Sequence, residues 1–397
     1  MKKNILLFVI DSMRIGGIQK ALINLLQKID YSQNDIYLLS FKNITKDDYK
    51  IPPNVHILKS SLILDIINNT TKSAKTRGML CWAVKCFFSV LCKIFGAKLI
   101  YTIVFKFCTI KTPENIEIAI SYTNNGNERS TYFGVNKFVI DHVRAERKVA
   151  YIHVDYEVQS LNTKNNALEY SKFDRIICVS KGCFRKFIKY NNKLHERCRV
   201  LYNIVANEEL LFERNIKYHH NNKFNIVSVG RMDANKNLMQ CINIAEILVK
   251  ENIDFEWVIC GSGPDFENIN TAIRQKNLSN FVKLTGYVKN TYCYIHRSDI
   301  LVSTSKTESF GMVIQEAILL KVPVVSLNYP ALDEILKNGM NGIIIFNDEP
   351  ELYAREIINI VNSKKHLYEL RKQCKSLIND NDSIRKFWEM INELKKS

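Results

Sequence analysis

The sequence lacks several features that would place it in a specialised class of protein. It has no internal repeat and no low-complexity tract, its eleven cysteines include no Cys-x-x-Cys pair, and its eight histidines show no metal-ligand spacing. No apolar run reaches the ~20 residues of a membrane-spanning helix. These absences argue against fibrous, disordered and disulfide-stapled proteins. We expect a globular chain with reduced thiols and no metal site.

A cleavable leader is also not expected. The stretch Met1–Ile10 imitates a signal peptide, but its apolar run is short, Asp11 ends it and no small-residue cleavage site follows. We interpret it as a first buried strand of a cytoplasmic protein.

The length of 397 residues and the order of apolar runs predict two domains. Nearly continuous apolar strands alternate with amphipathic helices in both halves, a rhythm typical of parallel sheets covered on both faces. The pattern breaks between residues 203 and 223. We therefore predict α/β domains at 1–205 and 206–380, each doubly wound and Rossmann-like, and facing each other across a cleft. A closing amphipathic helix within 381–397 is expected, and it could cross back to the N-terminal domain.

The net charge of +16 belongs to the first half of the chain. Residues 1–205 hold 32 Lys and Arg against 16 Asp and Glu, whereas residues 206–397 hold 24 against 24. This asymmetry points to an anionic partner of the first domain, either nucleic acid or an anionic membrane surface.

Acidic residues are missing altogether between Asp65 and Glu114, and eight basic residues occupy the segment 72–111. Lys85 and Lys93 fall about 80° apart on a helical projection, as do Lys98 and Lys106, so two short helices separated by Gly96 are predicted. One interpretation is a basic amphipathic segment lying in an anionic membrane interface. The other is a core-packing helix pair whose lysines reach outward into water. The absence of acids favours the membrane surface.

Two motifs in the second half carry the chemistry. The segment from Ser305 to Ala317 opens a helix at about Phe310 and places Glu308 and Glu316 eight residues apart. Backbone N–H groups at three positions are expected to point at a diphosphate: Phe310, Gly311 and Met312. Arg231 and Lys236, which follow another predicted strand, supply the cations that phosphates require.

The Gly-Arg-x4-Lys-Asn and Glu-x7-Glu motifs resemble those of the GT-B retaining glycosyltransferases of family four, the glycosyltransferase group 1 type. The resemblance covers essentially the whole chain and is stronger in the second half. It implies that Arg231 and Lys236 bind the donor diphosphate, that Glu308 contacts the transferred sugar and that Glu316 holds the ribose. The implied donor is a nucleotide sugar, at family level a UDP-sugar, used as a substrate without a cofactor or metal.

The same resemblance extends to residues outside these motifs. Gly16 and Gly17 resemble the family's glycine loop near the donor phosphate, His153 matches its histidine near the sugar, and Val288 lies in the segment that meets the nucleobase. The chain departs from the family at 327–331, where a glycine pair is common, and at Ser309, where many members have glycine.

The implied activity is transfer of a hexosyl group, with retention, to a membrane-associated glycan or lipid-linked acceptor in bacterial surface polysaccharide synthesis, such as capsule, exopolysaccharide or the O-antigen of lipopolysaccharide. The enzyme would be peripheral on the inner face of the plasma membrane. Alternatives are a GT-B relative acting as a sugar epimerase or phosphorylase, and a non-catalytic partner subunit. Nucleic-acid binding would explain the charge, but it leaves the C-terminal motifs without a role, so no nucleic-acid partner is expected.

Overall fold

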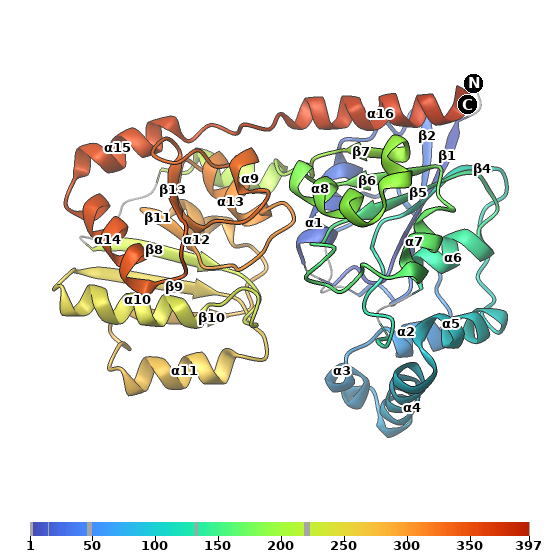
Figure 1. Cartoon of the computed structure of the whole chain (residues 1–397), viewed down its shortest axis with the longest axis horizontal. Helices are drawn as coiled ribbons and strands as arrows, with labels where there is room; N and C mark the ends of the chain where they lie inside the picture. The colour runs from blue at the N-terminus through green and yellow to red at the C-terminus, as the bar shows by residue number, and fades with distance from the viewer. Residues whose placement is uncertain (1–2, 15, 46–49, 132–133, 218–222, 397) are drawn as a thin grey trace. The chain divides into compact units, whose positions relative to one another are not determined.

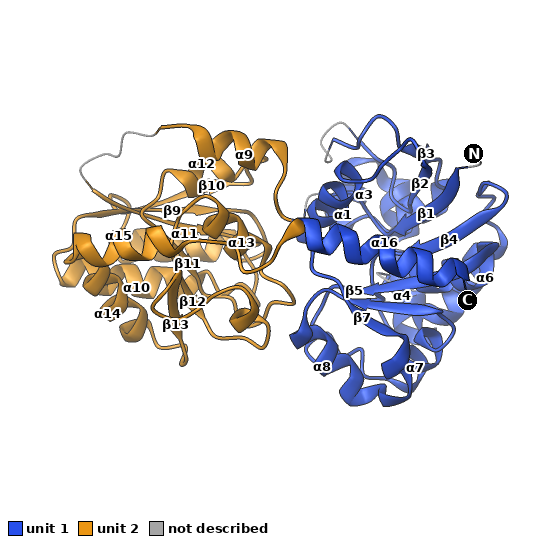
Figure 2. Cartoon of the chain, turned by 90° about the horizontal axis from the view of Figure 1, so that it is seen from above, with its two compact units in different colours: residues 1–204, 381–397 blue, residues 205–380 orange. Residues whose placement is uncertain are grey.

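A computed structural model describes residues 3–14, 16–45, 50–131, 134–217 and 223–396. The chain divides into two compact units, which Figure 2 distinguishes by colour. Unit 1 comprises residues 1–204 together with 381–397, and unit 2 comprises residues 205–380. Each unit contains one parallel sheet with connecting helices, so the predicted class of two Rossmann-like α/β domains is confirmed.

Unit 1 is built on a seven-stranded parallel sheet in the order β3-β2-β1-β4-β5-β6-β7. The order reverses between β1 and β4, because the chain runs outward on one side of β1 and then resumes on its other side. Right-handed crossovers then place helices on both faces. The strands are β1 (Asn4–Ile10), β2 (Asn34–Ser40), β3 (His56–Leu58), β4 (Ile116–Ser121), β5 (Ala145–Ile152), β6 (Arg175–Cys178) and β7 (Cys198–Val200).

The helices of unit 1 lie between these strands, with one further helix contributed by the end of the chain. They are α1 (Gly17–Gln27), α2 (Leu62–Ile67), α3 (Thr71–Thr76), α4 (Met79–Phe95), α5 (Ala97–Lys106), α6 (Val135–His142), α7 (Lys164–Tyr170), α8 (Lys181–Tyr190), the 3₁₀ turn η1 (Asn192–Arg197) and α16 (Asp380–Lys396). Figure 1 shows α3 and α4 beyond α5, farther from the sheet than the other helices of this unit.

Unit 2 has a six-stranded parallel sheet in the order β10-β9-β8-β11-β12-β13, which reverses between β8 and β11. Its strands are β8 (Phe224–Val229), β9 (Phe255–Cys260), β10 (Val282–Gly286), β11 (Ile300–Ser303), β12 (Val324–Leu327) and β13 (Gly342–Ile345). Its helices are α9 (Glu208–Asn215), α10 (Met239–Lys250), α11 (Phe266–Gln275), α12 (Tyr292–His296), α13 (Met312–Leu319), the turn η2 (Leu332–Glu334), α14 (Pro350–Val361) and α15 (Lys364–Gln373).

The helix α16 packs on unit 1 although it follows unit 2 in the chain. Its buried stripe consists of Phe387, Met390, Ile391 and Leu394. Polar contacts fix its end: Lys395 forms an ion pair of 2.7 Å with Glu117, and Arg147 donates from Nε to the carbonyl of Leu394 at 3.1 Å. The last turn is therefore held by both packing and charge.

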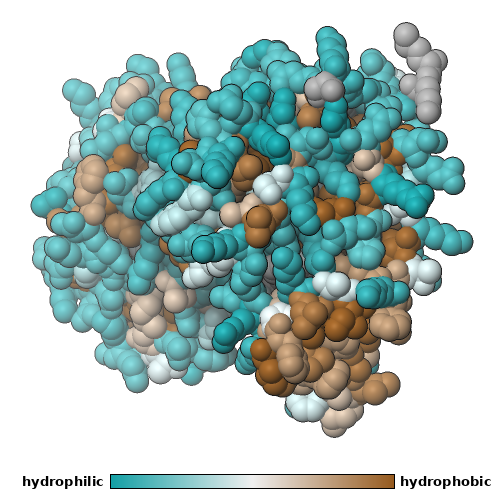
Figure 3. All heavy atoms as spheres, turned by 45° about the vertical axis from the view of Figure 1, so that its right-hand side comes forward, coloured by the Kyte–Doolittle hydropathy of each residue, from teal (hydrophilic) through white to brown (hydrophobic). Residues whose placement is uncertain are grey.

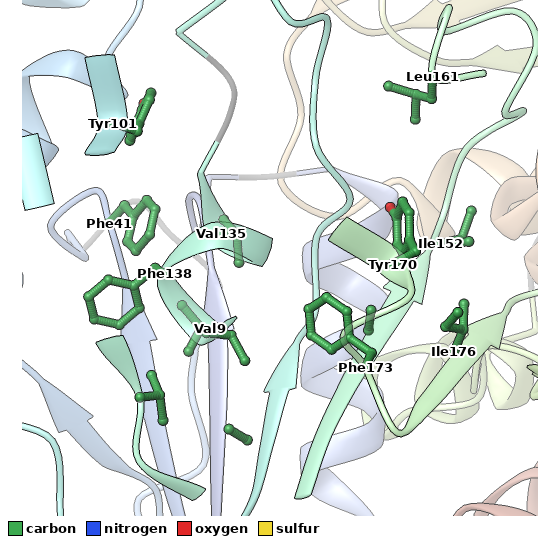
Figure 4. Close-up of a cluster of buried hydrophobic side chains, with 14 of the residues drawn as sticks. Val9, Phe41, Tyr101, Val135, Phe138, Ile152, Leu161, Tyr170, Phe173 and Ile176 are labelled. Carbon is green, nitrogen blue, oxygen red and sulfur yellow. The ribbon is translucent and has the colours of Figure 1, made fainter. Parts of the chain in front are cut away.

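The predicted helix pair within 72–111 is present as α4 and α5, separated by Gly96 at a φ of 81°. The two helices differ in their burial. The inner face of α5 enters the core of unit 1, the cluster that includes Tyr101, Phe41 and Phe138 (Figure 4). The ring of Tyr101 lies 5.4 Å from that of Phe105, and its Oη donates to the carbonyl of Thr131 at 2.6 Å. In α4 only Lys85 and Cys92 are buried.

Lys85 corrects the expectation of a basic face shared with Lys93. Its side chain is 3% exposed and donates from Nζ to the carbonyl of Ile67 at 2.6 Å and to Thr131 Oγ1. Burial lowers the pKa of Lys85 to about 8. The helical projection was right about spacing, but it could not show which side faces the protein.

Candidate functional site

The candidate site of unit 2 lies at the carboxyl edge of its sheet, where the strand order reverses. In open α/β sheets, ligands bind outside the carboxyl ends of the strands at such a point. The loop after β8 carries Arg231 and Lys236, and the loop after β11 carries Glu308. The two predicted motifs, about 70 residues apart in sequence, therefore start from neighbouring strands.

Asp233 shapes the loop after β8. Its Oδ1 accepts hydrogen bonds from the backbone amides of Asn235 at 3.1 Å and Lys236 at 3.0 Å, and its Oδ2 accepts from Arg231 Nε at 2.5 Å. Burial acts to raise the pKa of Asp233, but these hydrogen bonds outweigh it and the pKa lies below its ordinary value. The ionised carboxylate thus fixes the turn from which both cations extend, while the Arg231 side chain stays 75% exposed.

Lys236 and Glu308 meet directly. Lys236 Nζ forms an ion pair with Glu308 Oε1, and both side chains are about four-fifths buried. The backbones are joined as well: Asn235 accepts at its carbonyl from the Lys306 amide at 2.9 Å and donates from Nδ2 to the Thr307 carbonyl at 3.1 Å. Because an ammonium group has three donors, this lysine can hold Glu308 and a phosphate oxygen together.

The helix α13 begins at Met312, with Gly311 as its N-cap at a φ of 80°. This start lies two residues beyond the predicted one. The side chains of Phe310 and Met312 are buried, so these residues can face a ligand only through their backbone. The first amides of a helix have no partner within it, and they favour an anion. The structure therefore retains the expected amide-rich turn beside the ion pair.

Glu316 lies inside α13 and is 1% exposed. The carboxylate is on the same helix as the amide turn and about one turn further along. The contact of Glu316 with a ribose stays a prediction.

Sequence reasoning missed the Gly261-Ser-Gly263-Pro264 loop that follows β9. A Cβ on Gly261 would overlap the carbonyl of Gly230, and one on Gly263 would overlap that of Met232. The two loops are hydrogen-bonded backbone to backbone, with Met232 N to Ser262 O at 3.0 Å. Only glycine permits this approach. A Gly-x-Gly-Pro segment directly after a predicted strand was the signal that could have found it.

The predicted base-contacting segment lies at the edge strand β10. Gly286 ends this strand with a φ of 68° and accepts at its carbonyl from the Gly261 amide at 2.9 Å. Tyr287 is half exposed, and Val288 is partly buried. The segment therefore joins the same carboxyl edge as the phosphate-binding candidates.

The predicted residues of unit 1 lie at the carboxyl edge of its own sheet. Gly16 is the N-cap of α1, and Gly17 is the first residue of that helix. The φ of Gly16 is −176°, extended backbone that any residue adopts, and a Cβ there would meet Gln19 Oε1 at 2.6 Å. Since Gln19 is a flexible side chain, the fold alone does not explain this glycine. The close approach of a ligand would.

His153 directly follows β5 and is 5% exposed. Its ring stacks on Tyr151 at 5.4 Å between centroids and lies 4.8 Å from Tyr122. Burial lowers the pKa of His153 to about 3. The imidazole is therefore neutral near pH 7, and it can orient a substrate by hydrogen bonding but cannot act as a cationic acid.

Asp11 is a second residue that sequence reasoning missed. It follows β1 at the reversal of the unit 1 sheet, and its Oδ1 is buried with no hydrogen-bond partner in the described part of the chain. Burial raises the pKa of Asp11 to about 6, although hydrogen bonds from Ser12 and Thr123 act against the rise. The position directly after the first strand was the available signal.

The structure thus brings most predicted residues to two sheet edges. Unit 2 holds most of the residues predicted to bind a donor, and unit 1 holds Gly16 and Gly17 at the start of α1 and His153 directly after β5. Within the described ranges, no group of three or more His, Cys, Asp or Glu side chains could hold a metal ion.

Comparisons with known proteins agree with this architecture. Residues 212–377, which lie within unit 2, match the model of the family described as glycosyl transferases group 1. Over 153 residues the chain is 30% identical to the poly(glycerol-phosphate) alpha-glucosyltransferase of Bacillus subtilis, an overlap of 38% of this chain and 23% of that protein. The chain therefore spans only a part of such relatives.

Two solved structures share the fold over nearly the whole chain. TarM of S. aureus, crystallised as a mutant with fondaparinux, alpha-GlcNAc-glycerol and UDP, superposes with a TM-score of 0.69 at 14% identity and covers 98% of this chain and 100% of that one. Alr3699/HepE of Anabaena in complex with UDP gives 0.65 at 14% identity and covers 98% and 99%. At such identity the likeness establishes the GT-B fold.

Proposed function

We propose that this chain is a glycosyltransferase that moves a hexosyl group from a nucleotide diphosphate sugar, held by unit 2, to a glycan or lipid-linked acceptor. The observation that carries the proposal is the joining of Lys236 to Glu308 beside the start of α13, at the reversal of the unit 2 sheet. A cation, a carboxylate and an amide-rich helix start at one edge suit a diphosphate attached to a sugar.

Each group has a distinct task in the proposed reaction. Arg231 offers a planar fork and Lys236 a point charge to the phosphates, and the amides at Gly311 stabilise the negative charge that grows as the diphosphate leaves. Glu308, held in place by Lys236, accepts hydrogen bonds from hydroxyls of the transferred sugar. Glu316 binds the ribose, and the backbone at Val288 contacts the base.

The stereochemical course that we propose is retention. The acceptor hydroxyl attacks the anomeric carbon from the side of the departing diphosphate, whose oxygen takes up the hydroxyl proton. The carbon–oxygen bond to the diphosphate breaks as the new glycosidic bond forms. Positioning and preorganised charge supply the catalysis, so neither a nucleophilic side chain nor a cofactor is needed. A neutral His153 suits the orienting role assigned to it.

The proposed donor is a UDP-sugar, and the proposed acceptor belongs to a bacterial surface polysaccharide. Two proteins with the same fold were crystallised with UDP, and the Bacillus relative is named for a poly(glycerol-phosphate) substrate. We place the reaction at the inner face of the plasma membrane, where nucleotide sugars and lipid-linked acceptors meet.

A turnover assay tests the proposal. The chain is incubated with candidate UDP-sugars, and release of UDP is followed with and without a membrane extract that supplies lipid-linked acceptors. We expect release that depends on the extract and is lost in Lys236→Ala. Interconversion of the sugar without an acceptor would indicate an epimerase, phosphate-dependent cleavage a phosphorylase, and nucleotide binding without any turnover a non-catalytic subunit.

A further inference from the structure

The helix α4 turns its apolar face away from the protein. Leu80, Phe87, Val90 and Ile94 recur at spacings of seven, three and four residues, which places them on one side of the helix. They are 78%, 59%, 53% and 65% exposed. The opposite side carries the buried Lys85 and Cys92. Although Phe88 and Leu91 pack partly against the core, α4 thus buries one lysine and leaves a stripe of large apolar side chains exposed, contrary to the usual arrangement.

The neighbouring helix α5 extends this surface. Its outer residues Leu99 and Ile103 are 50% and 47% exposed, and Phe107 just beyond its end is 79% exposed. Figure 3 shows the result as a continuous hydrophobic protrusion at the lower right of the molecule. Contiguous apolar areas of this kind mark interaction surfaces.

The orientation of α4 is fixed by its polar anchor. Lys85 donates to the Ile67 carbonyl and to Thr131, so the ammonium group is tied to the body of unit 1. Rotating the helix to bury its apolar stripe would break these bonds and leave their acceptors without the lysine. The exposed stripe is consequently a stable feature of the folded unit.

Positive charge surrounds the stripe. Lys72 and Lys75 on α3, Lys93 on α4, and Lys98 and Lys106 on α5 are all exposed, and among the described residues none of the five forms an ion pair. The sequence has no acidic residue between Asp65 and Glu114 that could neutralise them. If a second copy of the chain docked through the same face, the lysines of the two copies would lie close together and repel each other. The stripe and its lysines are complementary to a partner that offers an apolar region bordered by negatively charged groups.

We propose that α4, together with the outer edge of α5, inserts its apolar stripe into the interface of an anionic lipid bilayer, with these five lysines at the level of the headgroups. A helix of 17 residues is about 25 Å long and would lie in the plane of the interface. Among the described residues, no helix is long and apolar enough to cross the bilayer. The inference goes beyond the proposed transfer reaction and does not depend on it.

Vesicle flotation with the full chain tests this inference. Vesicles of phosphatidylcholine alone are compared with vesicles that also contain phosphatidylglycerol. We expect binding to the anionic vesicles that persists at moderate salt. The fluorescence emission of Trp82, which lies on α4, should shift to shorter wavelength on binding. Phe87→Gln should weaken binding about tenfold or more, because a polar group replaces a phenyl ring that would be buried in the bilayer interface.

Matched variants separate insertion from other causes. Phe212→Gln alters a residue of similar exposure, 67%, on a helix of unit 2, and should leave vesicle binding unchanged. Lys93→Gln with Lys98→Gln should reduce binding to anionic vesicles by about an order of magnitude and reduce the preference for them. Since all these side chains are exposed, circular dichroism should show an unchanged fold, and UDP binding should be unaffected.

Several outcomes would overturn the inference. Absence of binding to anionic vesicles would do so, as would equal binding by Phe87→Gln and the parent chain. If the chain is a dimer in solution, does not bind vesicles, and becomes a monomer on Phe87→Gln, then a second copy covers this face. Failure of UDP binding or turnover with intact vesicle binding would instead count against the proposed reaction alone.

Discussion

Replacing Gly311 by alanine should damage unit 2 in a way that the structure makes measurable. This residue has a φ of 80°, and a Cβ there would overlap Tyr329 Oη and lie 2.9 Å from Ile335 Cδ1. The left-handed backbone costs alanine about 1–2 kcal/mol, partly offset by the stiffer unfolded chain. Overpacking adds about 1–3 kcal/mol. We expect Gly311→Ala to lower the free energy of unfolding by about 2–4 kcal/mol.

Gly339→Ala is the matched control. Gly339 has nearly the same backbone, a φ of 75°, but a Cβ added to it would have no atom within 4 Å. Only the backbone cost applies to this variant, so we expect a loss of about 1 kcal/mol or less. The difference between the two variants isolates the steric contact with Tyr329 and Ile335.

Urea unfolding followed by Trp257 fluorescence provides the assay. Trp257 is fully buried in unit 2, and the other two tryptophans, Trp82 and Trp388, belong to unit 1 and can be changed to phenylalanine. Tyr329→Phe should restore part of the stability of Gly311→Ala, since it removes the overlapping oxygen. Equal losses for the two glycine variants, or no rescue, would refute the steric reasoning.

Three further predictions follow from burial. Burial raises the pKa of Asp11 from 3.8 to about 6, so the native state disfavours the carboxylate; Asp11→Asn should raise stability by up to about 3 kcal/mol at pH 7.5, with almost no gain near pH 3, as measured by unfolding at both pH values. Because burial lowers the pKa of His153 to about 3, this side chain does not change its charge between about pH 5 and 8, and the pH–rate profiles of the parent chain and of His153→Gln should have the same shape in that range. Deleting residues 381–397 removes the buried stripe from Phe387 to Leu394, so unit 1 should lose its cooperative transition by circular dichroism while the Trp257 transition persists.

Much of the sheet architecture could be predicted because long apolar strands are recognisable from their residues alone. The stretch Met1–Ile10, predicted as a first buried strand, contains β1 (Asn4–Ile10), and the predicted alternation of apolar strands with helices is present in both units. The strands β3 and β7 cannot be recognised in this way, because each has only three residues, too few to establish a period, and each lies at a sheet edge. Length, rather than composition, limited the prediction.

The candidate site was harder to predict, because its contacts join distant segments. The sequence identified Lys236 and Glu308 separately, but their ion pair arises only when β8 and β11 become neighbours. In the same way, the role of Gly261 depends on the carbonyl of Gly230 in the adjacent loop. The direction of α4 depended on Lys85, a charged residue that periodicity alone assigns to the surface.

Titration of UDP into the full chain by calorimetry tests the central claim, that the carboxyl edge of the unit 2 sheet grips a diphosphate through Lys236. Loss of a charge-assisted hydrogen bond costs about 1.5–3 kcal/mol, so Lys236→Ala should weaken UDP binding about ten- to a hundredfold. The control Lys365→Ala changes an exposed lysine on α15 and should leave the Kd as it is. A Kd for Lys236→Ala equal to that of the parent chain would contradict the account.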